Sequence, residues 1–285
     1  MRDVAEDTAE DDNVTLLTAT GTSDVDIESQ STALVDMVAK GAEGILIAPS
    51  SSTALLPAIE TAKEAGVLVI AVDTPVDPVD AVDAYFATDN RAAGRLIGQY
   101  AKVKAQQLDL DPKIALLDLA PGISSGEARH RGFLDGFGIA EDDAAIVAMA
   151  DTQGDRGLGE ARMAEILAEH PDVNIVYTVN EPAALGALAA LKAAERDLEQ
   201  TILVSIDGGC QAIKDAVRPG DIDATAMQFP QNMAREGVRA LARAIRGGEK
   251  PVGYFDTGVE LVTGDPAPGD ESRDVAFGVR NCWGD

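Results

Sequence analysis

The run Val67-Leu-Val-Ile-Ala-Val-Asp73 decides the fold class, because it is apolar at every position and then ends in an aspartate. A strand that is apolar on both faces is typical of a parallel sheet covered by helices on its two sides. Similar runs occur at Gly44–Ala48 and Ile202–Ile206, and helix-like segments such as Asn90–Gln107 separate the runs. This alternation predicts an α/β protein built on parallel sheets.

The alternation of strands and helices occurs in two successive series. The first series extends from a predicted strand at Asn13–Ala19 to the long helix at Asn90–Gln107. The second begins with a predicted strand at Lys113–Asp118 and extends to Gly258–Val262. Two series predict two doubly wound lobes, and a chain of 285 residues has room for both.

Polar side chains stand at the carboxyl ends of the predicted strands, which is where doubly wound sheets bind ligands. They are carboxylates, amides and arginines: Asp73, Asp89, Asn90, Arg129, Arg131, Asn180, Glu181, Asp207 and Gln228. Carboxylates accept several hydroxyl hydrogen bonds, and arginine donates a planar fork of N–H groups. The set therefore favours a polyhydroxylated ligand. For any one of the aspartates, capping of the following helix is the simpler interpretation.

The chain is strongly acidic, with 49 aspartates and glutamates against 23 lysines and arginines and a formal net charge of −26. Such a surface repels phosphate backbones and anionic headgroups, which argues against nucleic-acid or membrane-surface partners. The acidity fits a salt-adapted protein and an acidic protein from an ordinary host equally well. No apolar run predicts a membrane span, and the acidic segment Met1–Asp12 lacks the apolar core of a signal peptide.

Motifs for catalysis are missing from the sequence. The glycines of Gly154–Gly159 are in the wrong order for a dinucleotide fingerprint, and there is no P-loop. His130 and His170 are far apart, so no histidine-based metal site is expected, and neither completes a triad with Ser124–Gly126. We therefore expect no cofactor, no metal and no catalytic residue.

Seven stretches together resemble the type I periplasmic sugar-binding proteins of ABC importers, the group of the ribose- and fructose-binding proteins. They are Gly44–Ser50, Val69–Asp73, Thr88–Gly94, Ala128–Gly132, Tyr177–Ala184, Val204–Cys210 and Ala224–Gln228. The run Asn180–Ala184, the Asp-Gly-Gly-Cys run from Asp207 and the Cys-Trp-Gly tail most resemble the fructose-binding branch. The resemblance implies two doubly wound lobes that close about a hinge on a monosaccharide held between them.

By position, the resemblance implies a set of sugar ligands, with three weaker candidates at the end: Asp73, Arg131, Asn180, Asp207, Gln228, Thr88, Ser50 and Glu181. Crossovers near Thr88, Gln228 and Asp256–Gly258 divide the chain into two lobes. The N-terminal lobe comprises residues 1–88 and 229–258, and the C-terminal lobe comprises residues 89–228 and 259–285. The implied partners are a fructose-like hexose or a pentose and the membrane permease subunits of an ABC importer. The implied protein is an extracytoplasmic monomer.

Three positions depart from the family pattern. Met1–Asp12 matches the helix that follows the family's first strand, so the N-terminal lobe is expected to lack that strand. Gly154 stands where the family usually has a phenylalanine or tryptophan that stacks on the sugar, and Thr74 stands where ribose binders often have arginine. These departures bear on which sugar is bound.

The resemblance also bears on the two cysteines, because both fall in the C-terminal lobe. In an exported protein Cys210 and Cys282 are expected to form a disulfide that pins the tail to the loop after Asp207, with two free thiols as the alternative. Trp283 is expected to pack within the tail.

Two other classes of protein remain as alternatives. The effector-binding core of a lac-repressor-type regulator shares this fold, but it predicts a helix-turn-helix and a basic arm that the sequence does not show. A sugar-processing enzyme predicts a metal or a catalytic histidine, and neither is evident, although paired carboxylates such as Asp73 with Asp207 could do acid/base work. Because fold alone cannot separate these classes, the strand-end residues decide in favour of a binding protein.

Overall fold

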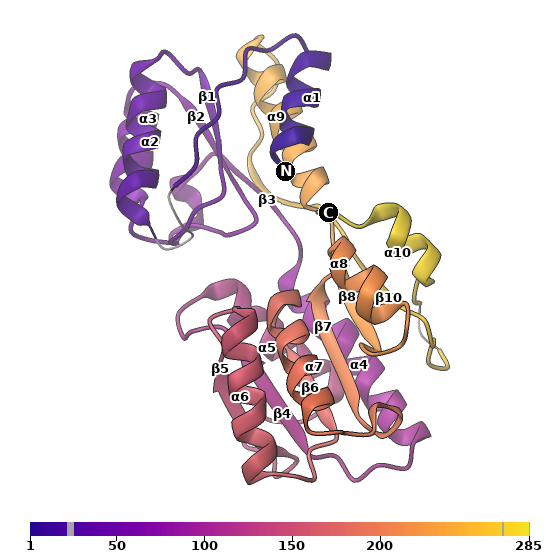
Figure 1. Cartoon of the computed structure of the whole chain (residues 1–285). Coiled ribbons are helices and arrows are strands. Elements are labelled where there is room, and N and C mark those ends of the chain that lie inside the picture. The colour runs from indigo at the N-terminus through magenta and orange to yellow at the C-terminus, as the bar shows by residue number, and fades with distance from the viewer. Residues whose placement is uncertain (22–25, 270, 285) are drawn as a thin grey trace. The chain divides into compact units, whose positions relative to one another are not determined.

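The computed structural model describes residues 1–21, 26–269 and 271–284. The chain divides into two compact units, coloured along the sequence in Figure 1. Unit 1 comprises residues 1–88 and 229–258, and unit 2 comprises residues 89–228 and 259–285. Each unit has its own sheet and its own hydrophobic core.

Unit 1 contains a four-stranded parallel sheet in the order β1-β2-β3-β9. Its strands are β1 (Gly44–Ile47), β2 (Leu68–Val72), β3 (Ala84–Ala87) and β9 (Gly253–Asp256). The side chains of β2 alternate between two cores, because successive residues of a strand point to opposite faces. Val69 packs with α2 (Ile27–Ala39) and α3 (Leu56–Glu64), whereas Ile70 packs with α9 (Pro230–Ile245). The apolar run that begins at Val67 is thus buried on both faces, as predicted.

The segment Asn13–Ala19 corrects one expectation, because it does not form a strand. β1 is the edge of the sheet in the described part of unit 1, and no strand there pairs with this segment. An extended segment without a hydrogen-bonded neighbour cannot bury its apolar face, and Leu17 is accordingly 48% exposed. The preceding helix α1 (Arg2–Asp11) packs against α9.

Unit 2 contains a six-stranded sheet in the order β10-β8-β7-β6-β4-β5, in which only the pairing of β10 with β8 is antiparallel. Its strands are β4 (Ile114–Asp118), β5 (Ile146–Asp151), β6 (Ile175–Thr178), β7 (Ile202–Asp207), β8 (Ala224–Gln228) and β10 (Val259–Thr263). The helices α4 (Asn90–Gln107) and α5 (Ser124–Phe137) build the main core against this sheet. The sheet is doubly wound, and the predicted α/β class is confirmed.

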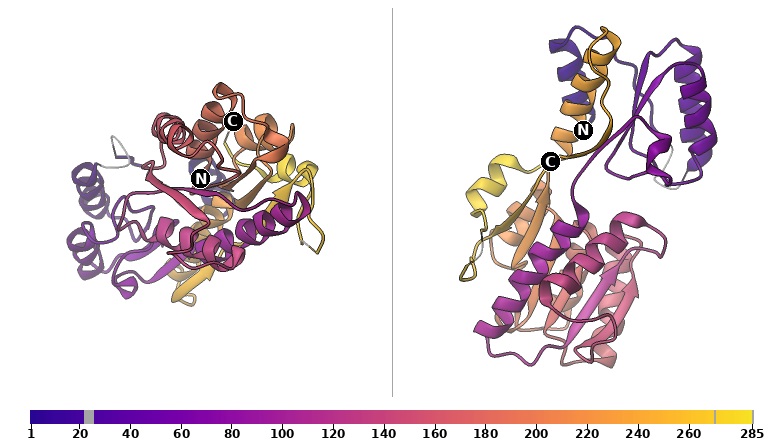
Figure 2. Two further views of the ribbon diagram at one scale, coloured as in Figure 1. Left: turned by 90° about the horizontal axis from the view of Figure 1, so that it is seen from below. Right: turned by 180° about the vertical axis from the view of Figure 1, so that it is seen from behind.

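The remaining helices of unit 2 complete its packing. The helices α6 (Arg156–Glu169) and α7 (Glu181–Ala193) pack against each other and against the sheet. The short helix α8 (Cys210–Ala212) continues as a π-helical turn over Ile213–Val217. The last helix, α10 (Val275–Asn281), packs against that turn and against β10 (Figure 2). No helix in the described part of the chain has the length and apolar character needed to cross a bilayer.

Four glycines bring α4 and α5 into backbone contact. A Cβ atom at Gly94 of α4 would lie 2.0 Å from the carbonyl oxygen of Arg129, and one at Gly132 of α5 would lie 2.2 Å from the carbonyl oxygen of Arg91. Gly98 and Gly136 make equivalent contacts one turn further along the two helices. Since no other residue lacks a Cβ, only glycine permits this approach. The contact places the start of α4 beside the first turns of α5.

Candidate ligand site

Asp207 is the centre of a cluster of polar residues in unit 2, called here the Asp207 cluster, which also includes Arg129, Glu181 and Gln228. It is the last residue of β7, and it is 7% exposed. Its backbone φ of 116° lies in a region that side-chain-bearing residues rarely adopt. Backbone strain of this kind persists only where neighbours hold it, and it gathers at functional sites. Asp207 therefore marks the carboxyl end of β7 as the candidate ligand site.

Both carboxylate oxygens of Asp207 have partners. Arg129 Nη1 lies 3.2 Å from Oδ1, and Gln228 Nε2 donates to the same oxygen at 2.9 Å. The backbone N–H of Glu181 donates to Oδ2 at 3.2 Å. A buried charge is costly unless an opposite charge lies beside it, and the Arg129 guanidinium supplies that opposite charge. Donors thus converge on both oxygens and fix the orientation of the carboxylate.

Arg129 is fixed by two further hydrogen bonds. Its Nε donates to Asn90 Oδ1 at 2.8 Å, and its Nη1 donates to the carbonyl oxygen of Val179 at 2.9 Å. Asn90 is the first residue of α4, so this bond depends on the backbone contact between α4 and α5. The Arg129 side chain is 8% exposed, and its guanidinium cannot move without breaking these contacts.

Arg131, which the resemblance implied as a ligand, lies outside this cluster. Its side chain is 63% exposed and pairs with Glu127 one turn away, at 3.2 Å. Two residues along a helix correspond to a rotation of about 200°, so Arg129 and Arg131 face in nearly opposite directions. The arginine that meets Asp207 is instead Arg129, which shares the buried helix face of Gly132 and Phe133, and a ligand role for Arg131 stays a prediction. This helical phase was the signal in the sequence that could have identified Arg129.

Asn180 and Glu181 stand at the start of α7, beside Asp207. Asn180 caps the helix by accepting a hydrogen bond from the Ala183 N–H at 3.1 Å, and Glu181 accepts hydrogen bonds from Gly209 and Ala212 N–H groups at 2.6 and 3.2 Å. Burial raises the pKa of the Glu181 carboxyl, and the nearby charge of Asp207 adds to this effect. Both side chains thus have structural partners within unit 2, and a role in ligand binding stays a prediction.

The structure of unit 2 explains why position 154 is a glycine. Its φ is 69°, and a Cβ there would lie 2.6 Å from Asn180 Nδ2. The same Nδ2 donates to the Gly154 carbonyl oxygen at 3.1 Å. An aromatic side chain at this position would displace Asn180, so the missing aromatic and the placement of Asn180 are linked.

The candidates of unit 1 all follow the strands of its sheet. Asp73 directly follows β2 with a φ of 65°, and the Tyr85 hydroxyl donates to its carbonyl oxygen at 2.7 Å. Thr88 directly follows β3 and is 3% exposed. Ser50 lies just beyond β1, and its N–H and hydroxyl donate to Gln30 Oε1 at 2.9 and 2.7 Å. Because β1, β2 and β3 are parallel neighbours, these three residues lie at one edge of the sheet.

His130 has a separate role from the Asp207 cluster. Its Nδ1 lies 2.9 Å from Asp118, and its Nε2 lies 3.0 Å from Glu141. The hydrogen bond to Asp118 is the main cause that raises the pKa of the imidazole. Among the described residues, no group of three histidines, cysteines, aspartates or glutamates is arranged to hold a metal ion. His130 is thus a member of an ion-pair network.

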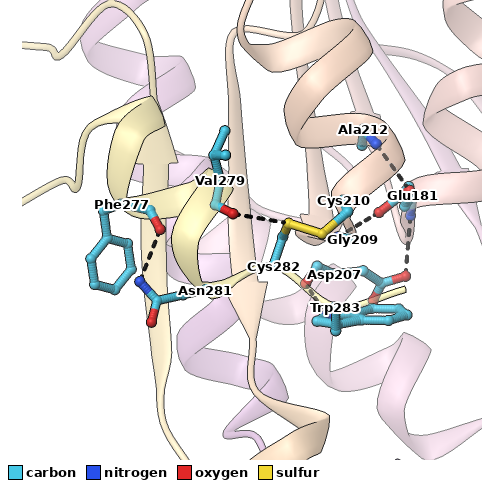
Figure 3. Close-up of a disulfide and its surroundings, with 10 residues drawn as sticks. All are labelled: Glu181, Asp207, Gly209, Cys210, Ala212, Phe277, Val279, Asn281, Cys282 and Trp283. Carbon is cyan, nitrogen blue, oxygen red and sulfur yellow. Dashed lines mark hydrogen bonds between the residues drawn. A yellow bond between two sulfur atoms is a disulfide. The ribbon is translucent and has the colours of Figure 1, made fainter. Parts of the chain in front are cut away.

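The tail of the chain returns to the Asp207 cluster. Cys210 and Cys282 form a disulfide, with their Cα atoms 4.9 Å apart (Figure 3). Trp283 Nε1 donates to the carbonyl oxygen of Asp207 at 3.2 Å. The candidate site is therefore held from the side of α4 and α5 and from the C-terminal tail.

The sequence model of a family described as "Periplasmic binding protein domain" matches residues 1–250. The chain belongs to this periplasmic binding protein family. It is 30% identical over 249 residues to the D-ribose/D-allose-binding protein of Pseudomonas aeruginosa, covering 84% of this chain and 76% of that protein. It is also 30% identical over 227 residues to the ribose import binding protein of Escherichia coli, covering 80% and 73%.

Solved structures of periplasmic binding proteins share the fold. An ABC transporter solute-binding protein from Actinobacillus succinogenes, solved with bound D-allose, is 25% identical to this chain with a TM-score of 0.82, and the match covers 92% of this chain and 91% of that one. The expected likeness to type I periplasmic sugar-binding proteins is confirmed. The relatives named here carry ribose or allose in their names, so the fructose-binding branch stays a prediction.

Proposed function

We propose that this protein is the solute-binding component of an ABC sugar importer and that it binds a monosaccharide without chemical change. The Asp207 cluster carries the proposal. A buried carboxylate, a guanidinium and an amide converge at the end of β7. Arg129 Nη2 makes no hydrogen bond among the described residues, so it is available to a ligand oxygen. Such a group of donors and acceptors suits a ring with several hydroxyls.

The proposed ligand is a pentose or a hexose. D-ribose and D-allose are supported by the names of the relatives, and a fructose-like hexose by the motifs of the sequence. Such a site is specific because a buried carboxylate or guanidinium that the sugar leaves without a hydrogen-bond partner has lost its water. Each such group weakens the binding free energy by about 1–3 kcal/mol. We include Asp73, Thr88 and Ser50 of unit 1 in the proposed set of ligands, with Asn180, Glu181 and Gln228 of unit 2.

The family supports an extracytoplasmic protein that works with an importer in the membrane. We propose that the permease subunits of that importer receive the loaded protein and that the protein itself is monomeric. The relatives are binding proteins, which favours this function over the core of a lac-repressor-type regulator and over an enzyme.

A thermal-shift screen with D-ribose, D-allose, D-fructose, D-arabinose and myo-inositol tests the proposal. A ligand at about a hundred times its Kd stabilises the folded protein by about 2.7 kcal/mol, which raises the Tm of a chain of this size by roughly 5–10 °C. Asp207→Ala should abolish the shift. The matched control is Asp172→Ala, which removes an exposed carboxylate from the same unit and should keep the shift. A parent protein whose Tm responds to no sugar would overturn the proposal.

A further inference from the structure

The loop from Asp207 to Ala212, called here the Asp207 loop, is tied to the C-terminal tail by two hydrogen bonds. Trp283 Nε1 donates to the Asp207 carbonyl oxygen at 3.2 Å, and the Cys210 N–H donates to the Trp283 carbonyl oxygen at 2.8 Å. A parallel bridge pairs Gly209 with Trp283. Figure 3 shows the indole against the loop. Trp283, 76 positions further along the chain, thus holds the backbone of Asp207, whose carboxylate is the proposed ligand.

The disulfide prevents the tail from leaving the loop. Cys210 belongs to the loop, and Cys282 directly precedes Trp283. The indole is therefore one peptide unit away from a covalent bond to the loop that it contacts. On the other side of Cys282, α10 packs against β10, so the tail is anchored at both ends.

The Asp207 loop needs this support because its conformation is strained. Asp207 has a φ of 116°, and Gly208 has a φ of 71° with Met227 only 2.5 Å from where a Cβ would lie. The Glu181 carboxylate holds the next part of the loop through the N–H groups of Gly209 and Ala212. A non-glycine residue in this conformation costs about 1–3 kcal/mol and persists only when its neighbours hold it. Trp283 is the neighbour that holds the Asp207 carbonyl oxygen.

We propose that Trp283 is a positioning residue for the Asp207 carboxylate and that the Cys210–Cys282 disulfide keeps it in place. The effect on affinity rests on the proposed function in sugar binding. Trp283 acts through the backbone of Asp207, because its indole N–H donates to the Asp207 carbonyl oxygen, whereas Gln228 and the Glu181 N–H donate to the carboxylate oxygens. Losing it releases the strained backbone, so the carboxylate loses its orientation toward Arg129 and Gln228.

The first experiment measures the Kd of D-ribose and D-allose by calorimetry for the parent and its variants. Trp283→Phe keeps an aromatic ring and removes the N–H donor, and it should weaken binding about threefold to tenfold, as expected for one lost hydrogen bond. The double variant C210A/C282A should weaken binding at least as much. Val279→Ala, a matched change in the same tail that truncates a 38% exposed side chain and keeps the backbone contact with Cys282, should leave the Kd unchanged. A Kd within twofold of the parent for both test variants would overturn the proposal.

Reduction and reoxidation give a reversible form of the same test. Dithiothreitol breaks the Cys210–Cys282 bond, leaves two cysteine thiols and becomes a cyclic disulfide with its own two thiols oxidised. The reduced protein should bind more weakly, and removal of the reagent in air should restore the parent Kd as oxygen re-forms the disulfide. No change on reduction would count against the proposal.

Hydrogen exchange separates this inference from the proposed function, because it needs no sugar. In Trp283→Phe and in the reduced protein, the amides of Gly209, Cys210 and Ala212 should exchange faster, while those of β4 should not change. Trp283 is the only tryptophan of the chain, so reduction should also increase quenching of its fluorescence by acrylamide.

The two proposals can fail separately. If the parent binds no sugar, the proposed function is wrong. If the loop amides also exchange no faster in Trp283→Phe or in the reduced protein, the support of the loop by Trp283 is wrong as well. Faster exchange together with unchanged sugar affinity would overturn the positioning role.

Discussion

Asp73 and Asp207 share a backbone feature that their sequence surroundings do not reveal. Each ends or directly follows a buried strand, and their φ angles are 65° and 116°. An aspartate that serves only as a helix cap does not need a positive φ, since caps typically have extended backbone. The strain favours a ligand role for both residues over the capping interpretation.

Arg129 and Arg131 provide a matched pair of variants at the residue scale. Arg129→Met leaves the Asp207 carboxylate buried without a cation, and we expect a loss of about 3–5 kcal/mol of unfolding free energy together with loss of sugar binding. Arg131→Met removes an exposed pair and should cost under about 1 kcal/mol. Urea unfolding and calorimetry measure both effects. Loss of binding in Arg131→Met with normal binding in Arg129→Met would reverse the assignment of the ligand.

Asp223 predicts a pH dependence of stability. Burial raises the pKa of its carboxyl to about 7, although the Leu203 N–H donates to it at 2.8 Å and Lys104 is nearby. The folded state therefore holds a proton that the unfolded state releases near pH 4, and this group lowers stability as the pH rises from about 4 to about 7. About one pH unit above this pKa its contribution becomes constant.

Asp223→Asn removes this titration and keeps an oxygen that can accept from Leu203. We expect the variant to match the parent near pH 4 and to exceed its unfolding free energy by about 1–3 kcal/mol at pH 8, a range set by the energy of burying a charged group. Urea unfolding of both proteins at the two pH values measures the difference. An equal difference at both pH values would show that the Asp223 pKa is not raised.

At the scale of elements, the backbone contact between α4 and α5 is the feature that positions Arg129. The spacing of Gly94 and Gly98 in one helix and of Gly132 and Gly136 in the other places each pair on one helical face. The sequence predicted α4, which begins and ends where expected, at Asn90 and Gln107. It did not show that these two helices touch, because their contact joins segments from different parts of the chain.

Gly132→Ala tests this contact. The added Cβ meets the Arg91 carbonyl oxygen at 2.2 Å, so the helices must separate. We expect a loss of about 1–3 kcal/mol of unfolding free energy, typical of overpacking, and weaker sugar binding because Arg129 moves away from Asn90. Gly157→Ala in α6 is the control, since its nearest neighbour is an Asp155 oxygen at 3.3 Å and the residue is exposed. Equal effects of the two changes on denaturant unfolding would argue against the helix contact.

At the scale of the whole molecule, the net charge of −26 is the dominant property. Twelve ion pairs link described residues, so most of the 49 carboxylates have no cationic partner in that set. Repulsion among surface carboxylates opposes the compact state, and dissolved salt screens it.

Salt should therefore stabilise the protein. Raising sodium chloride from about 0.1 to about 1 M shortens the Debye length from about 10 to about 3 Å, and we expect the Tm to rise by several degrees. Calorimetry at neutral pH measures the rise. The same change near pH 4.2, the isoelectric point, should have a much smaller effect because the net charge is close to zero. A Tm that does not depend on salt at neutral pH would contradict the prediction.

The sequence by itself determined the α/β class, the two series of strands and helices, and the family, because apolar periodicity and short motifs are local properties. It also pointed to Asp73 and Asp207 as strand-end residues. Only the tertiary structure decided that Arg129 pairs with Asp207, that Asn13–Ala19 forms no strand, and that Trp283 supports the Asp207 loop. Each of these depends on which distant segments meet, and hydrogen bonding, burial and steric contact between such segments arise only when the chain is folded.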